Sequence, residues 1–121
     1  MPHPSAHAIL GIKKKPEAVF QNKFIKWLKQ FPGYIIEYKY TSGSYAAKKF
    51  IPDVLFICNG VPIFFELKVG NNGMSAGQKQ TKIALELCGA IHYELKEDWF
   101  YSTGKKQLET FFTKLLKVSH E

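Results

Sequence analysis

The sequence predicts an α/β fold in one domain, with the element order α, β, β, β, α, β, α. Two β-rich runs flank Asn59-Gly60, the dipeptide most typical of a two-residue hairpin loop. Stretches with helical apolar spacing precede and follow this hairpin. The chain has 121 residues, of which 45% are hydrophobic, and this is enough for one core without disulfides.

The first helix follows a short N-terminal arm. Residues 1–12 are expected to form a flexible arm, and residues 13–121 to form the domain. Pro16 opens the helix, because proline is favoured at the first helical position, and a Pro-Gly pair ends it near Phe31. Glu17 shares a helical face with aromatic residues and is expected to join the buried stripe.

Turn and capping signals place the remaining elements. Strands are expected at 34–40, 51–58, 61–68 and 90–95, and helices at 75–88 and 105–118. Ser75 and Gln78 fit a capping box at the start of the middle helix. The apolar stripe of the last helix could pack on its own sheet or form a dimer interface, and the aromatic run 99–101 is a second candidate for that interface.

The two-residue loop of the hairpin fixes its register. Cys58 faces Val61, so Asp53 falls opposite Glu66 at a non-hydrogen-bonded position, where facing Cα atoms are about 4.5 Å apart. Lys68 lies on the same face. Like charges opposite each other are destabilising, so this pair requires a shared proton or a bound cation.

The two prolines of the hairpin are compatible with this register. Pro62 occupies a non-hydrogen-bonded position near the start of its strand, where it interrupts no bond to the partner strand. Pro52 lacks the N–H that the next pair would need, so pairing should end or bulge just beyond Asp53.

A divalent metal is the simpler explanation of the acidic pair. Mg²⁺ prefers hard oxygen ligands and keeps several waters, which suits phosphodiester hydrolysis. Lys68 could orient or deprotonate the attacking water, or stabilise developing charge. Glu17 would approach from the first helix.

The charge balance favours a polyanionic partner. The formal net charge is +7, and all 17 basic residues are lysine. Lysine contacts phosphate as a point charge, whereas guanine edges are mainly recognised by arginine, so recognition of backbone and shape is expected. Cys58 and Cys88 are expected to be small core residues in a reducing compartment. With no signal peptide and no apolar run of about 20 residues, a cytoplasmic protein without membrane contact is expected.

Pro52-Asp53 followed by Glu66-Leu67-Lys68 in this element order resembles the PD-(D/E)xK nuclease superfamily. The closer resemblance is to stand-alone phage members of the virus-type replication-repair nuclease (VRR-NUC) domain. It implies a restriction-endonuclease-like core with a mixed four-stranded sheet flanked by helices, plus a C-terminal helix here. It implies Mg²⁺ at Glu17, Asp53, Glu66 and the Leu67 carbonyl, with Mn²⁺ as a substitute and with Lys68 and Gln78 assisting.

The same resemblance implies DNA cleavage, and for small phage members it implies a homodimer that resolves Holliday junctions in the host cytoplasm. DNA contacts are expected from a basic rim and the neighbouring loop: Lys48, Lys49, Lys79, Lys82, Ser44 and Tyr45. Tyr45 could stack on an unpaired base or simply pack.

Several alternatives stay open at this point. Gln80 competes with Gln78, because it lies closer to the apolar stripe of Ile83, Ala84 and Leu87. The substrate could instead be flaps, nicks or specific duplex sequences. The protein could also be a non-catalytic DNA-binding module. One metal or two fit the pattern equally.

Overall fold

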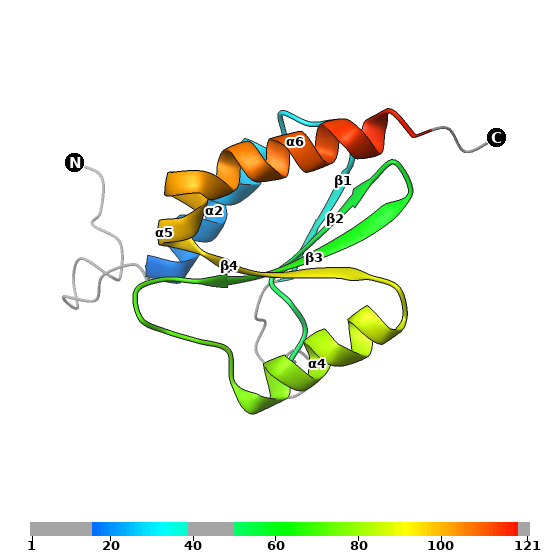
Figure 1. The fold of residues 1–121 in the computed structure, drawn as a ribbon. Helices are drawn as coiled ribbons and strands as arrows, with labels where there is room; N and C mark the ends of the chain where they lie inside the picture. The colour runs from blue at the N-terminus through cyan, green and yellow to red at the C-terminus, as the bar shows by residue number, and fades with distance from the viewer. Residues whose placement is uncertain (1–15, 39–49, 119–121) are drawn as a thin grey trace, which may run out of the picture.

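The computed structural model describes residues 16–38 and 50–118. In this part of the chain an α/β fold is present, with a four-stranded mixed sheet flanked by helices (Figure 1). The predicted N-terminal arm lies outside the described residues, as do Ser44, Tyr45, Lys48 and Lys49.

The described elements follow the predicted order, with two additional short helical segments. They are α2 (Pro16–Leu28), β1 (Tyr34–Glu37), β2 (Val54–Cys58), β3 (Val61–Lys68), α4 (Ala76–Leu87), β4 (Ile91–Lys96), α5 (Glu97–Trp99), a π-helical turn η1 (Phe100–Gly104) and α6 (Lys105–Leu116). The helices α2 and α6 cover one face of the sheet, and α4 lies on the other (Figure 1).

The hairpin register predicted from the sequence is confirmed. Asn59 and Gly60 have φ values of 50° and 82°, as a type I′ turn requires. Cys58 pairs with Val61, and the antiparallel ladder ends at the pair Val54 and Phe65. Pro52 therefore stops the pairing where its missing N–H predicted an interruption.

The fourth strand extends the sheet beyond the hairpin. The strand order is β1-β2-β3-β4, and β4 runs parallel to β3. A parallel neighbour needs a crossover connection, and α4 provides it. The register aligns Glu66 with Glu94 and Lys68 with Lys96, so these side chains share one face.

Aromatic rings fill the core between the sheet and the layer of α2 and α6. Phe24 of α2 contacts Phe65 of β3 edge-on, with ring centroids 4.8 Å apart. Phe112 of α6 contacts Phe56 of β2 in the same way at 5.1 Å. The apolar stripe of the last helix is therefore used within the chain rather than as a free surface.

Two residues of the aromatic run after β4, Trp99 and Phe100, pack in the core, whereas Tyr101 is exposed. Phe100 is only 1% exposed, and Trp99 stacks on Tyr93 with centroids 6.4 Å apart. A Cβ on Gly104 would approach the Trp99 ring to 2.6 Å, so this glycine allows the π-helical turn to close on the indole.

Of the two expectations about cysteine burial, one is confirmed and one is wrong. Cys58 is buried, but Cys88 is exposed at the end of α4, and both thiols are free. The helix α4 contains no buried residue, and its apolar residues Ile83 and Leu87 are 58% and 83% exposed. The side of α4 toward the sheet is half-buried and is formed by Gln78, Thr81, Lys82 and Leu85.

Candidate active site

Asp53 and Glu66 meet on the face of the sheet that carries α4. Continuing the observed register by one pair places Asp53 opposite Glu66, as predicted. Their side chains alternate with the core residues Val54 and Phe65, so they point away from α2 and α6. Glu66 is only 4% exposed, which makes it a buried carboxylate.

The Asp53 side chain accepts the hydrogen bond that the backbone of Pro52 would otherwise share with Leu67. Beyond Val54 and Phe65 the next hydrogen-bonded pair would be Pro52 and Leu67. The Leu67 N–H donates instead to Asp53 Oδ2, at 2.8 Å. The interruption at Pro52 thus positions the aspartate against the strand that carries Glu66.

The same geometry orients the Leu67 backbone. In an antiparallel ladder a residue directs its N–H and its C=O to the same neighbouring strand. Since the Leu67 N–H points to Asp53, its carbonyl oxygen lies on that side of β3. Two carboxylates and one carbonyl oxygen therefore converge on the end of the hairpin.

The surroundings of Glu66 raise its pKa to about 8. Burial contributes most, because it penalises the charged form, and the neighbouring Asp53 carboxylate contributes next. Glu17 acts weakly in the same direction, whereas Lys68 and a hydrogen bond from Gln78 lower the pKa. Without a cation, Glu66 is therefore mostly protonated at neutral pH.

The side-chain amide of Gln78 makes two hydrogen bonds, one to the acidic pair and one within the helix cap. Its Nε2 donates to Glu66 Oε1 at 2.6 Å, and its Oε1 accepts from the Ser75 N–H at 2.9 Å. Ser75 Oγ in turn accepts from the Gln78 N–H at 3.2 Å, completing the predicted capping box. Gln80 is exposed, so Gln78 is the glutamine that reaches the acidic pair.

Lys68 lies beside this pair in a surface depression. The depression, of about 550 Å³, is lined by Lys68, Phe50 and the segment from Gly73 to Gln78. Lys68 is half-buried, and its charge lowers the pKa of Glu66. The lysine therefore lies within electrostatic range of the carboxylates, next to a space open to a ligand.

The expectation that Glu17 joins the buried stripe of α2 is wrong. It is exposed in the first turn of α2, and its buried neighbours on that helix are aromatic and aliphatic. No group of three or more His, Cys, Asp or Glu side chains suited to a metal ion occurs among residues 16–38 and 50–118. Asp53 and Glu66 thus stand as a pair of carboxylates.

Two oxygen side chains and one carbonyl still fit a magnesium ion. Mg²⁺ commonly uses one or two carboxylates and completes its octahedral shell with waters and substrate oxygens. Glu66, held against Asp53 with a raised pKa, is a carboxylate that a nearby cation would stabilise in its charged form. The donor set therefore suits the ion that the sequence predicts.

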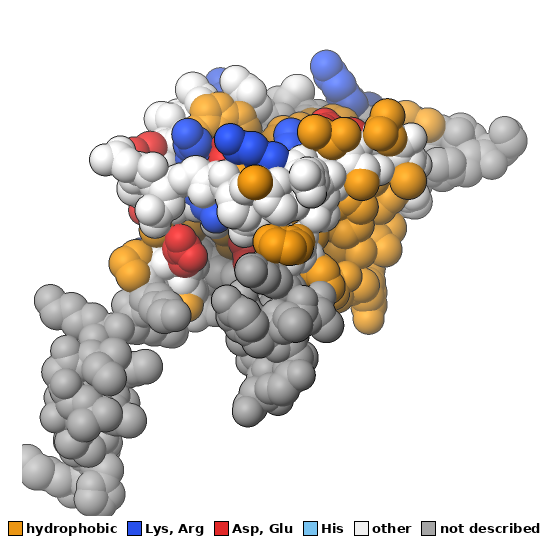
Figure 2. Space-filling view, turned by 90° about the horizontal axis from the view of Figure 1, so that it is seen from below, with side chains coloured by type: hydrophobic (Ala, Val, Ile, Leu, Met, Phe, Trp, Pro, Cys, Tyr) orange, Lys and Arg blue, Asp and Glu red, His pale blue; other side chains and the backbone are white. Residues whose placement is uncertain are grey.

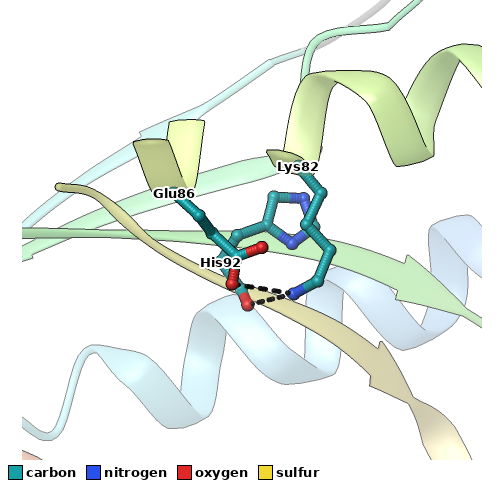
Figure 3. Close-up of polar contacts among 3 residues, drawn as sticks. All are labelled: Lys82, Glu86 and His92. Atoms are coloured by element: carbon teal, nitrogen blue, oxygen red, sulfur yellow. Dashed lines mark hydrogen bonds and ion pairs between the residues drawn. The ribbon is translucent and has the colours of Figure 1, made fainter. Parts of the chain in front are cut away.

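The predicted basic rim is only partly in place. Lys79 is exposed. Lys82 instead donates to the His92 carbonyl oxygen at 2.7 Å and lies 3.6 Å from the Glu86 carboxylate (Figure 3). Since both contacts lie within the chain, Lys82 supports the packing of α4 on β4 rather than extending toward a phosphate.

Two polar residues near the site were not predicted. Glu94, aligned with Glu66, accepts a hydrogen bond from the Met74 N–H at 3.2 Å and so anchors the segment before α4. His92 is buried with an unpartnered Nδ1, and burial and nearby Lys82 lower its pKa. The sequence could not place Glu94 and His92 beside the site, because a crossover connection, unlike a tight turn, does not fix the register of β3 and β4.

Comparison with known proteins adds no assignment. None of the helices in the described ranges is long and apolar enough to cross a membrane. No protein-family model matches the chain, and neither the curated proteins nor the solved structures contain a match.

Proposed function

We propose that this protein is a metal-dependent endodeoxyribonuclease of the PD-(D/E)xK type that hydrolyses phosphodiester bonds. The observation that carries the proposal is the opposition of Asp53 and buried Glu66 across the hairpin, beside Lys68. An acidic pair with a buried member is costly in a purely structural role, because desolvation of Glu66 and repulsion between the two carboxylates both oppose ionisation.

The metal would be held by Asp53, Glu66 and the Leu67 carbonyl oxygen. When bound, a divalent cation supplies charge stabilisation at a scissile phosphate and a water that ionises near neutral pH. Gln78 fixes the orientation of the Glu66 carboxylate through its 2.6 Å hydrogen bond. The Leu67 N–H fixes the orientation of the Asp53 carboxylate by donating to its Oδ2.

Lys68 would act on the phosphate or on the attacking water. An ammonium group in the depression can donate to a phosphate oxygen and balance the negative charge that develops on it. Glu17, exposed in the first turn of α2, would add a further carboxylate on that side of the site, since its charge already acts on Glu66. The net charge of +7 favours association with a nucleic acid backbone.

The substrate proposed is a four-way DNA junction. This choice rests on the likeness of the Pro52-Asp53 and Glu66-Leu67-Lys68 motifs to phage VRR-NUC enzymes. A four-way junction has near-twofold symmetry, so a dimer with two sites matches it. Exposed Lys79 would contact phosphates on the side of α4.

A cleavage panel tests the proposal. Purified protein is incubated with four-way junction, flap and linear duplex DNA, with Mg²⁺ or with chelator. We expect Mg²⁺-dependent cutting of the junction with linear duplex spared, and loss of cutting in Asp53→Ala and Lys68→Ala by about 100-fold or more.

Lys96→Ala is the matched control, because Lys96 is the register partner of Lys68 and is exposed. It should cut like the unmodified protein. Binding of junction DNA without cutting under any metal condition would instead favour the non-catalytic module. Cutting at the unmodified rate by both Asp53→Ala and Lys68→Ala would refute the assigned site.

A further inference from the structure

The aromatic ring of Phe50 lines the depression that also contains Lys68. Phe50 is 42% exposed, and it is the aromatic residue among those that line this depression of about 550 Å³. Figure 2 looks onto the side of the sheet that carries α4 and shows hydrophobic side chains among lysine and acidic side chains there. Exposed apolar side chains occur singly on most protein surfaces, so the position of this ring matters more than its exposure.

The first turn of α4 fixes the position of the ring. A Cβ added to Gly77 would collide with three carbon atoms of the Phe50 ring, so the ring lies directly against the backbone of this turn. Glycine leaves room for so close an approach. The turn is itself anchored, because the Met74 N–H donates to Glu94 at 3.2 Å and Ser75 closes the capping box. The ring is therefore packed on a fixed element.

The depression adjoins the carboxylate pair. Gln78 lines the depression and donates to Glu66 at 2.6 Å. Phe50 precedes Asp53 by three residues, so their Cα atoms are at most about 11 Å apart. A DNA strand whose scissile phosphate lies at the carboxylate pair therefore brings an adjacent nucleotide within reach of the ring.

The depression offers a partner to each of the two parts of a nucleotide. The phenyl ring presents a face to a base, and such stacking strengthens binding by roughly fivefold to a hundredfold. The Lys68 ammonium presents a point charge to a phosphate. None of the described residues that line the depression is acidic, so no carboxylate there repels the phosphate. The volume of about 550 Å³ is in the usual range for a small organic group.

A base inside a regular duplex cannot use this ring. Each of its faces is covered by a stacked neighbour, and taking the base out of the stack costs free energy. That cost is smallest for bases that are already unpaired or mismatched. A ring beside the cleavage site therefore favours DNA in which the neighbouring nucleotide has left the stack.

We propose that Phe50 is a specificity-determining residue that stacks on an unstacked base next to the scissile phosphate, while Lys68 contacts that phosphate. The assignment rests on the proposed nuclease function and deepens it, because it names the feature of the DNA that is recognised. The ring contacts the face of the base rather than its edge, so any of the four bases satisfies the contact.

Two oligonucleotides that differ only in their bases test the contact without reference to cleavage. One is a single strand of about 12 thymidines, and the other has the same length and charge but carries no bases. Fluorescence anisotropy in chelator measures both affinities. The unmodified chain should bind the thymidine strand about tenfold or more tightly than the abasic strand. Phe50→Leu should bind both strands within about twofold of each other, because leucine offers no ring face.

Two further variants control for the loss of apolar surface. Phe50→Tyr keeps the ring and should keep the preference for the thymidine strand. Tyr101→Leu is the matched control, because Tyr101 is 47% exposed in η1 and lies outside the depression. It should keep the preference as well. Circular dichroism checks that each variant is folded, and the comparison of the two strands on the unmodified chain needs no variant.

A junction with a single abasic nucleotide extends the test to the proposed substrate. The abasic sugar is moved one position at a time along the strand around the cut. Cutting by the unmodified chain should fall most at one position beside the cut. Phe50→Leu should be insensitive to the abasic sugar at that position, because the ring and the base are the two halves of one contact.

Equal affinity of the unmodified chain for the two strands would overturn the stacking assignment. A preference that persists in folded Phe50→Leu would overturn it as well, as would an equal loss in Tyr101→Leu. An intact base preference in a protein that cuts no DNA under any metal condition would instead contradict the proposed function. Cutting of junctions without any base preference would contradict the role of Phe50 alone, so the two failures are distinguishable.

Discussion

Glu66 occupies surroundings that oppose its ionisation. It is buried, it faces Asp53, and its carboxyl group accepts a hydrogen bond from the neutral amide of Gln78. Its pKa rises to about 8 from an ordinary value of 4.5. Between these two pH values the folded chain binds more protons than the unfolded chain. Stability should therefore fall as pH rises through this window.

The melting temperature of the metal-free protein should decrease from about pH 5 to about pH 9. Glu66→Gln should flatten this dependence, because it removes the group that must lose a proton. Glu94→Gln, at the aligned position of β4, should keep it. Thermal denaturation in chelator measures all three, and a melting temperature of the unmodified chain that does not fall over this range would contradict the ionisation assigned to Glu66.

At the scale of elements, the start of α4 links helix capping to the acidic pair. Ser75 closes the capping box, and Gln78 uses its remaining N–H groups to reach Glu66. The two roles can be separated, because Ser75 contributes to the cap alone.

Ser75→Ala should destabilise the fold by about 1 kcal/mol, the usual cost of losing an N-cap side chain, and should leave metal-dependent cleavage within a few-fold of normal. Gln78→Ala should produce a similar loss of stability and a much larger loss of cleavage. Chemical denaturation measures the free energy of unfolding of each variant, and cutting of junction DNA measures its cleavage rate. Equal effects of both substitutions on cleavage would show that Gln78 acts only through the cap.

The hairpin tip fastens the last helix to the sheet. Asn59 holds a positive φ of 50°, and its Nδ2 donates to the carbonyl oxygens of Leu115 and Val118 at 2.6 and 3.0 Å. Leu115 lies in the last turn of α6 and Val118 just beyond its end, so the Asn59 side chain connects the hairpin tip to the end of this helix.

Asn59→Gly should lose the two hydrogen bonds but still adopt the positive φ without strain. Asn59→Ala should lose the two hydrogen bonds and, in addition, strain the backbone at this φ. The alanine variant should therefore be less stable by about 1–2 kcal/mol more than the glycine variant. Urea denaturation of the pair measures this difference. An alanine variant as stable as the glycine variant would show that the turn conformation costs nothing at this position.

The sequence predicted elements whose geometry depends on local chemistry. A two-residue loop sets the hairpin register, so the facing of Asp53 and Glu66 followed from counting. The capping box of Ser75 and Gln78 was likewise predicted from local chemistry, whereas the role of Gln78 beside Glu66 came from the family resemblance, with Gln80 as its rival. Prediction was wrong where distant packing decides: Glu17 was expected in the buried stripe of α2 and Cys88 in the core, but both are exposed. The helical turns around Phe100 carry no apolar period that separates them from a loop.

At the scale of the whole molecule, the sheet divides two kinds of surface. One face holds the aromatic core with α2 and α6 (Figure 1). The other holds the carboxylate pair at one end, and half-buried Leu55 and Ile57 follow Asp53 along β2 on the same face. Stability is concentrated on the first face, which leaves the second face available for the proposed chemistry.

The binding of a divalent cation between Asp53 and Glu66 is the central claim, and titration calorimetry tests it directly. At about pH 7 most Glu66 side chains carry a proton that a metal must displace. Mn²⁺ or Mg²⁺ should therefore bind with release of nearly one proton, detected in buffers of different ionisation enthalpy. Asp53→Asn and Glu66→Gln should lose binding, and Glu94→Gln should retain it. Unchanged binding in both site variants, or binding without proton release, would contradict the account.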